Sequence, residues 1–256
     1  MSSVVKLFRH FDYGGFTVMT HETKMLGGNS LYGKGLRYMH THGLLSTGRR
    51  FIYLLYRETF VRFMEWRFDH KLGVQTAGVV NHPTDSANPL HRLAAEYQGT
   101  SPAIFQKIMR SIGCLTAPYV FYDIGCGKGR VLLMAAAQRS FKRVVGIEFV
   151  PELARVAEDN ISCFRAKNPG TKEIEVACGD AAQYRFPDED AVFFFFNPFQ
   201  QEIMTKVLEN IRLSAKSSKH RYIIYYNPVL AHLLSEPEKF ALIAKEKKYS
   251  IYRIHL

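Results

Sequence analysis

A short buried strand followed by three closely spaced glycines is the feature that most constrains the fold of this chain. The apolar and aromatic run Tyr119–Tyr122 indicates the strand. From Asp123 the sequence continues as D-x-G-x-G-x-G, and a helix is predicted over residues 131–138. Glycine allows positive φ and leaves no Cβ between the main chain and a ligand. A strand, a glycine turn and a helix in this order are typical of the ligand crevice of doubly wound α/β folds.

The acid ahead of the glycines separates two classes of cofactor. A dinucleotide fingerprint has the spacing G-x-G-x-x-G and holds a pyrophosphate at the helix N-terminus. Asp123 would repel a pyrophosphate but suits a cationic ligand with an amino group and a sulfonium. The turn resembles the first motif of the class I S-adenosylmethionine-dependent methyltransferases. This resemblance implies that the S-adenosylmethionine site includes Asp123, Gly125, Cys126 and Gly127.

The chain after the glycine turn predicts the remaining strands and helices of that family. Strands are expected at Arg143–Glu148, Glu173–Cys178, Ala191–Phe196, Tyr222–Tyr226, Phe240–Ala244 and Ser250–His255. Helices are expected over residues 103–112, 151–166, 201–215 and 229–235. Right-handed crossovers then give an α/β fold with a doubly wound, seven-stranded, mostly parallel sheet that contains one antiparallel strand. The resemblance covers residues 95–256, which are expected to form the methyltransferase domain.

Further cofactor contacts follow from the resemblance. Glu148 ends the second strand and resembles the acid that binds both ribose hydroxyls. Asp180 resembles the residue that accepts a hydrogen bond from the adenine amino group, with the main chain of Ala181 beside it. Tyr97 and Thr100 lie in the segment that closes over the methionine end of the cofactor in this family. Each acid alone could be a solvated strand end, but the spacing of both acids after the glycine turn favours the cofactor site.

The sequence Asn197-Pro198-Phe199 follows the fourth strand and suggests the acceptor. It resembles the N/D-P-P-Y/F motif of methyltransferases that act on planar amino groups, which implies catalytic roles for Asn197 and Phe199. The single proline leaves the register of the stacking residue open. A looser segment of this kind, and the turn D-I-G-x-G-x-G-R, resemble the non-SET protein lysine methyltransferases. A protein lysine is therefore the expected acceptor, with a small-molecule or nucleic-acid amine as the alternative. Asn197 could instead cap the next helix and contribute only locally.

Residues 1–94 are expected to form a basic extension with one long helix. Residues 1–117 carry 14 Lys and Arg against 7 Asp and Glu, in a chain with a net charge of +11. This balance favours anionic partners, including nucleic acid. The helix is predicted over residues 47–71 and to stop at Gly73. We expect it to pack its apolar residues on the catalytic domain with its arginines in solvent, and a membrane-binding surface is the alternative.

Other classes of function find less support. The four cysteines have no C-x-x-C spacing, which predicts reduced thiols and no metal site. No apolar run approaches the roughly 20 residues needed to span a bilayer, and no secretory h-region is found, so a cytoplasmic protein is expected. A nicotinamide oxidoreductase is disfavoured by the glycine spacing and by Asp123. A non-catalytic protein that binds nucleic acid or a partner through its basic part remains the alternative to an enzyme.

Overall fold

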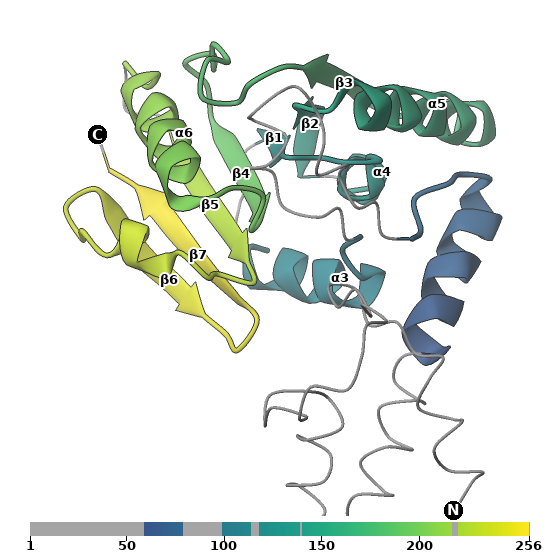
Figure 1. The fold of residues 1–256 in the computed structure, drawn as a ribbon, viewed down its shortest axis with the longest axis horizontal. Helices are drawn as coiled ribbons and strands as arrows, with labels where there is room; N and C mark the ends of the chain where they lie inside the picture. The colour runs from purple at the N-terminus through teal and green to yellow at the C-terminus, as the bar shows by residue number, and fades with distance from the viewer. Residues whose placement is uncertain (1–58, 79–98, 114–117, 139, 217–219, 256) are drawn as a thin grey trace, which may run out of the picture. The chain divides into compact units, whose positions relative to one another are not determined.

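The computed structural model describes residues 59–78, 99–113, 118–138, 140–216 and 220–255 (Figure 1). The chain divides into two compact units, residues 1–62 and 63–256. This division lies earlier in the chain than the boundary after residue 94 that the sequence suggested. Most of the first unit, and with it the start of the expected long helix, lies outside the described residues. The sheet and the candidate site belong to the second unit.

A seven-stranded sheet forms the centre of the second unit, in the strand order β3-β2-β1-β4-β5-β7-β6. Its strands are β1 (Tyr119–Ile124), β2 (Phe141–Glu148), β3 (Glu173–Cys178), β4 (Ala191–Phe196), β5 (Arg221–Tyr226), β6 (Phe240–Lys245) and β7 (Tyr249–Ile254). The pairs from β3 to β5 are parallel, and β7 runs antiparallel to both β5 and β6. The expected sheet with one antiparallel strand is confirmed. The strand order reverses between β1 and β4, which is where such sheets open a ligand crevice.

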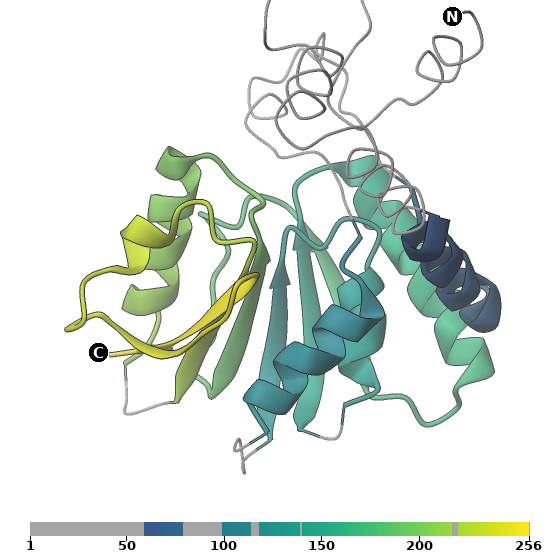
Figure 2. The ribbon, with the colours of Figure 1, turned by 90° about the horizontal axis from the view of Figure 1, so that it is seen from below.

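Helices cover the two faces of this sheet (Figures 1 and 2). On one face pack α3 (Pro102–Ser111), α4 (Arg130–Ala136) and α5 (Pro151–Lys167). On the other pack α6 (Gln201–Leu213) and the single 3₁₀ turn η2 (Ala231–Leu234), which lies within the range 229–235 expected to be a helix. All six residues of β1 and five of the six in β4 are buried, so these central strands carry side chains in both halves of the core.

The described part of the N-terminal helix covers residues 59–72 and stops at Gly73, as expected. Gly73 has φ 70°, and its N–H donates to the Asp69 carbonyl at 2.7 Å. The expected orientation is found only in part: Phe68 and Leu72 pack against the core, but Phe63 and Trp66 are 51% and 56% exposed. Glu65 is turned inward instead, toward the buried Arg130. No helix in the described ranges is long and apolar enough to cross a membrane.

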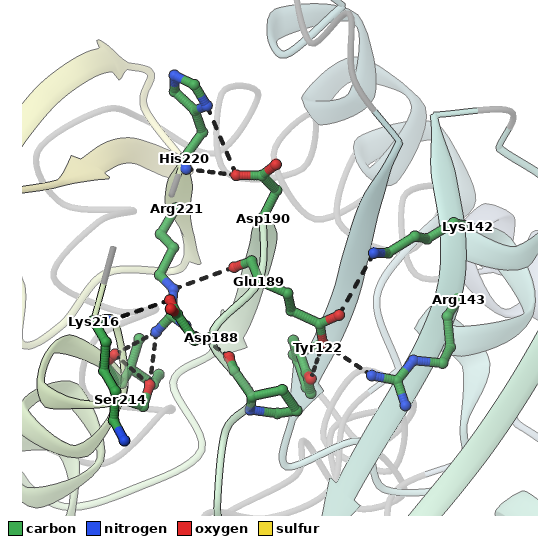
Figure 3. Close-up of polar contacts among 12 residues, drawn as sticks. Tyr122, Lys142, Arg143, Asp188, Glu189, Asp190, Ser214, Lys216, His220 and Arg221 are labelled. Carbon is green, nitrogen blue, oxygen red and sulfur yellow. Dashed lines mark hydrogen bonds and ion pairs between the residues drawn. The ribbon is translucent and has the colours of Figure 1, made fainter. Parts of the chain in front are cut away.

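A polar network ties together the amino ends of the central strands, at the edge opposite the crevice (Figure 3). The Glu189 carboxylate accepts hydrogen bonds from the Tyr122 hydroxyl at 2.7 Å and from Arg143 at 2.9 Å. The fully buried Arg221 donates to the carbonyls of Pro187 and Ile211, each at 2.7 Å. These bonds fix the loop before β4 against β2 and β5. They hold the sheet rigid while leaving the carboxyl ends of its strands available for a ligand.

Candidate functional site

The glycine turn after β1 is held against β2 and packs closely on the loop after β4. The N–H groups of Gly125 and Cys126 both donate to the Ile147 carbonyl, at 2.8 and 3.1 Å. Gly125 has φ 79°, and a Cβ built on it would lie only 2.7 Å from the Cβ of Pro198. A larger residue at Gly125 would therefore be strained and would push the two loops apart. The turn is a rigid cradle of main chain.

Two carboxylates meet beside this cradle. Glu148 at the end of β2 accepts hydrogen bonds from the N–H of Gly127 at 2.7 Å and of Val150 at 2.9 Å. Asp123 in β1 is 3% exposed. Burial, and then the nearby Glu148, raise the pKa of Asp123 well above its usual value. Keeping both groups ionised is costly in free energy, and a bound cation would offset that cost.

A pocket of about 520 Å³, including its open mouth, lies next to Glu148. Its walls combine apolar side chains with acids, and include Glu148, Phe149, Asp180, Phe199 and Ile203. The Asp180 carboxylate is held in place by the N–H of Ala182, at 2.9 Å. Apolar walls for a flat ring and carboxylates for hydroxyl and amino groups fit an adenosine. The described residues contain no group of three or more His, Cys, Asp and Glu side chains that could hold a metal ion.

Several of the residues expected at the cofactor site line the pocket, whereas others lie away from it or outside the described residues. Gly125, Glu148, Asp180 and Ala181 all line the pocket. The Cys126 thiol points away from it, toward β2, since a Cβ on Gly146 would lie 2.7 Å from its sulfur. Burial raises the pKa of this thiol, so only the Cys126 main chain is suited to meet a ligand. Thr100 is buried, and Tyr97 lies outside the described residues.

Phe199 lines the same pocket as Asp180 and Ile203. This position suits a contact with a cofactor ring. The expected stacking of Phe199 on an acceptor amine stays a prediction.

Asn197 ends β4 in a left-handed conformation with φ 43°. Its side-chain oxygen accepts a hydrogen bond of 3.1 Å from the Tyr225 hydroxyl, which in turn accepts one of 3.2 Å from the Leu230 N–H. Helix α6 begins at Gln201 after Gln200, so Asn197 does not cap it. The alternative that Asn197 caps the next helix is therefore wrong. The hydrogen bond from Tyr225 orients the Asn197 side chain at the carboxyl end of β4, the edge of the sheet where a crevice is expected.

A second asparagine in the same conformation follows β5 and was not predicted from the sequence. Asn227 has φ 51° and, like Asn197, is followed by proline. The strand register pairs Phe196 with Tyr226, so the two asparagines end neighbouring parallel strands. In the sequence, an aromatic residue, asparagine and proline follow one another at the end of both strands. This repetition could have indicated Asn227.

Arg130, immediately after the glycine turn, anchors the segment that precedes α3. Its guanidinium is 1% exposed and donates to the Thr76 hydroxyl at 2.7 Å and to Glu65 at 2.9 Å. A third nitrogen lies 3.8 Å from Asp69 and makes no hydrogen bond in the described structure. The side-chain oxygen of Asn160 in α5 also accepts a hydrogen bond of 2.7 Å from the Gln75 N–H. Residues 63–77 are therefore attached to the glycine turn itself.

Residues 121–217 match the family model of the methyltransferase domain. This part of the chain is thus a methyltransferase domain. The resemblance read from the glycine turn is thereby confirmed, and S-adenosylmethionine is the cofactor of this family. The fold is the one expected. Binding of the adenosyl part of the cofactor in the pocket beside Glu148 stays a prediction.

Two curated proteins are similar to this chain. A histone-lysine N-methyltransferase, H3 lysine-79 specific, from Dictyostelium discoideum is 24% identical over 170 residues, or 61% of this chain. A protein-lysine N-methyltransferase from Saccharolobus islandicus is 29% identical over 101 residues, or 40% of this chain. The matches span only 9% and 60% of these relatives.

Solved structures are more distant. An RNA methyltransferase from Salinibacter ruber, in complex with S-adenosyl-L-homocysteine, has a TM-score of 0.42 and 17% identity, over 61% of this chain and 92% of that chain.

Proposed function

We propose that this protein transfers a methyl group from S-adenosylmethionine to an amine, and that the acceptor is the side chain of a protein lysine. The observation that supports methyl transfer most directly is the buried pair Asp123 and Glu148 beside the pocket that Asp180 and Phe199 also line. A buried pair of acids calls for a cation, and this cofactor carries two cationic groups. The two curated relatives, both lysine methyltransferases by name, support the choice of acceptor.

Residues in and beside the pocket have distinct binding roles in this proposal. Glu148 accepts hydrogen bonds from the ribose hydroxyls, since a carboxylate oxygen can accept more than one bond. Asp180 accepts a hydrogen bond from the adenine amino group, and Phe199 packs on the ring. Asp123 and the main chain of the glycine turn bind the methionine part. The cofactor supplies an electrophilic methyl group, and the chain supplies alignment and the exclusion of water.

Asn197 orients the acceptor. The Tyr225 hydroxyl holds its side-chain oxygen at the carboxyl end of β4. In that position the oxygen accepts one hydrogen from the amine and directs the lone pair of the nitrogen toward the methyl group. The amine must be neutral to attack, and transfer from water into a crevice lowers the pKa of an amine. This account requires no strong base on the protein.

Incubation of the protein with tritiated S-adenosylmethionine and fractionated cell extract tests the proposal. We expect label in the protein fraction, and methyl-lysine after acid hydrolysis. Label confined to nucleic acid or to small molecules would overturn the lysine assignment and leave methyl transfer intact. Calorimetry that detects NAD binding but no binding of S-adenosylmethionine would overturn both. The Glu148→Ala variant, which should bind the cofactor weakly, is the control for contaminating activity.

A further inference from the structure

The helix at residues 59–72 turns its acids toward the protein. Glu65 and Asp69 lie on the inward side, where they meet Arg130. Asp69 also accepts hydrogen bonds of 2.7 Å from the N–H groups of Thr76 and Ala77. The buried guanidinium requires these acids, because a buried charge without a partner is costly. The opposite side of the helix has therefore no carboxylate within residues 63–72.

That opposite side carries a row of rings with two cations beside it. Phe63, Trp66 and His70 share one side of the helix, and their neighbouring ring centroids are 5.9 and 5.1 Å apart. Phe63 and Trp66 are 51% and 56% exposed. Arg67 and Lys71, four residues apart and also exposed, lie alongside the rings. These five residues form what we call the aromatic-basic face.

We propose that the aromatic-basic face binds the surface of an anionic lipid bilayer. A helix that lies in a membrane interface places Trp and Phe at the boundary of the acyl chains and carries Lys and Arg for the head groups. The long side chains of Arg67 and Lys71 can reach anionic head groups while the rings enter the bilayer. The absence of an acid on this face within residues 63–72 removes the repulsion that such a surface would otherwise exert.

The ring geometry favours a bilayer over a nucleic acid. Trp66 and His70 are stacked with an angle of 13° between their planes, so one side of the indole is already covered. Proteins that bind single strands offer open ring faces on which bases stack. The row Phe63, Trp66 and His70 is instead a continuous strip along the helix. A strip of this kind suits the disordered interface of a membrane.

The sequence provides a direct probe, because Trp66 is the single tryptophan of the chain. The intact protein is titrated with vesicles of phosphatidylcholine alone and with vesicles that also contain phosphatidylserine. With the anionic vesicles we expect the Trp66 emission to shift to the blue and iodide to quench it less. Bromine-labelled lipid in the same vesicles should then quench it directly. Unchanged emission with anionic vesicles overturns the proposal.

Matched double variants separate this face from net charge. Arg67→Gln with Lys71→Gln removes two cations from the face, whereas Lys247→Gln with Lys248→Gln removes two exposed cations from the turn between β6 and β7. The first pair should weaken vesicle binding by roughly tenfold or more, on a scale of about 1 kcal/mol for each basic residue at a membrane. The second pair should weaken it much less. Equal losses, or a shift of Trp66 emission with an oligonucleotide and not with vesicles, overturn the proposal. None of these measurements depends on methyl transfer.

Discussion

The main-chain N–H of Gly127 donates a hydrogen bond of 2.7 Å to the Glu148 carboxylate. This bond joins the glycine turn after β1 to the end of β2. The group proposed to bind the ribose therefore also fixes the cradle proposed to hold the methionine part. In this proposal, the Glu148 carboxylate both binds the ribose and keeps the glycine turn ordered around the methionine part.

Substitution of Glu148 tests this connection. Glu148→Ala removes hydrogen bonds to a charged group, which are worth about 1.5–3 kcal/mol. We expect the affinity for S-adenosylmethionine to fall by roughly tenfold to a hundredfold, as measured by calorimetry. Glu152→Gln, at an exposed position in the first turn of α5, is the control and should leave the affinity unchanged. Wild-type affinity in Glu148→Ala would remove this residue from the cofactor site.

We expect the ionised Asp123 to reduce the stability of the folded protein and to promote binding of the cationic cofactor. Because its pKa is raised in the folded protein, the folded state holds this proton more tightly than the unfolded chain does. The stabilisation of the folded protein by this proton is fully present below the pKa that Asp123 has in the unfolded chain. It is lost as the pH rises through the pKa of Asp123 in the folded protein. We therefore expect Asp123→Asn to melt at a higher temperature than the wild type without cofactor, with a difference that grows from acidic to neutral pH.

The same variant should bind the cofactor less tightly, because it lacks the charge that meets the cationic ligand. Melting curves and calorimetry across this pH range measure both effects. Melting temperatures that differ equally at every pH would contradict the proposed role of ionisation. Unchanged cofactor affinity in Asp123→Asn would show that the charge does not meet the ligand.

Asn197→Gly tests the alignment of the acceptor. Glycine adopts φ 43° without strain, so this variant removes the side chain and keeps the backbone. We expect single-turnover methyl transfer to fall by roughly a hundredfold, the scale for loss of one positioned contact in the transition state. Cofactor affinity should change little. Asn227→Gly makes the same change at the neighbouring strand end and should cost much less. If both variants lose activity equally, the asparagines act through the loops and not through the acceptor.

Arg130→Met tests the attachment of residues 63–77. Loss of one partner of a buried ion pair costs about 3–5 kcal/mol, because the other charges stay behind. We expect denaturant unfolding to show a decrease of this order. Arg155→Met, on the exposed side of α5, should have almost no effect. A protein shortened to begin at Leu90 lacks Glu65, Asp69 and Thr76, and should be destabilised even though Arg130 is intact. Wild-type stability of the shortened protein would contradict this account.

The sheet could be predicted from the sequence because its signals are local. The strands Glu173–Cys178 and Ala191–Phe196 were placed at their observed bounds. The first begins with alternating polar and apolar residues, the second is an apolar run, and a turn residue follows each. The pocket acids Glu148 and Asp180 could be placed for the same reason. Each directly ends or follows such a strand, and the carboxyl ends of parallel strands meet at one edge of a sheet.

The orientation of the N-terminal helix could not be predicted in this way. The spacing of its apolar residues predicts that they all face inward, but Arg130, 65 positions beyond Glu65, brings Glu65 to the inward side as well. A lone arginine after a glycine turn carries no sequence signal of burial. The contact of Tyr225 with Asn197, over 28 positions, is equally invisible before the strands are paired.

The close approach of Pro198 to Gly125 limits which substitutions this protein can accept. With the two residues this near, neither position tolerates a larger side chain without displacement of the other loop. Libraries intended to change the acceptor should keep both fixed and vary the exposed tip after β5, where Asn227 and Val229 face solvent. Larger side chains at these exposed positions can then change acceptor specificity without displacing a neighbouring loop.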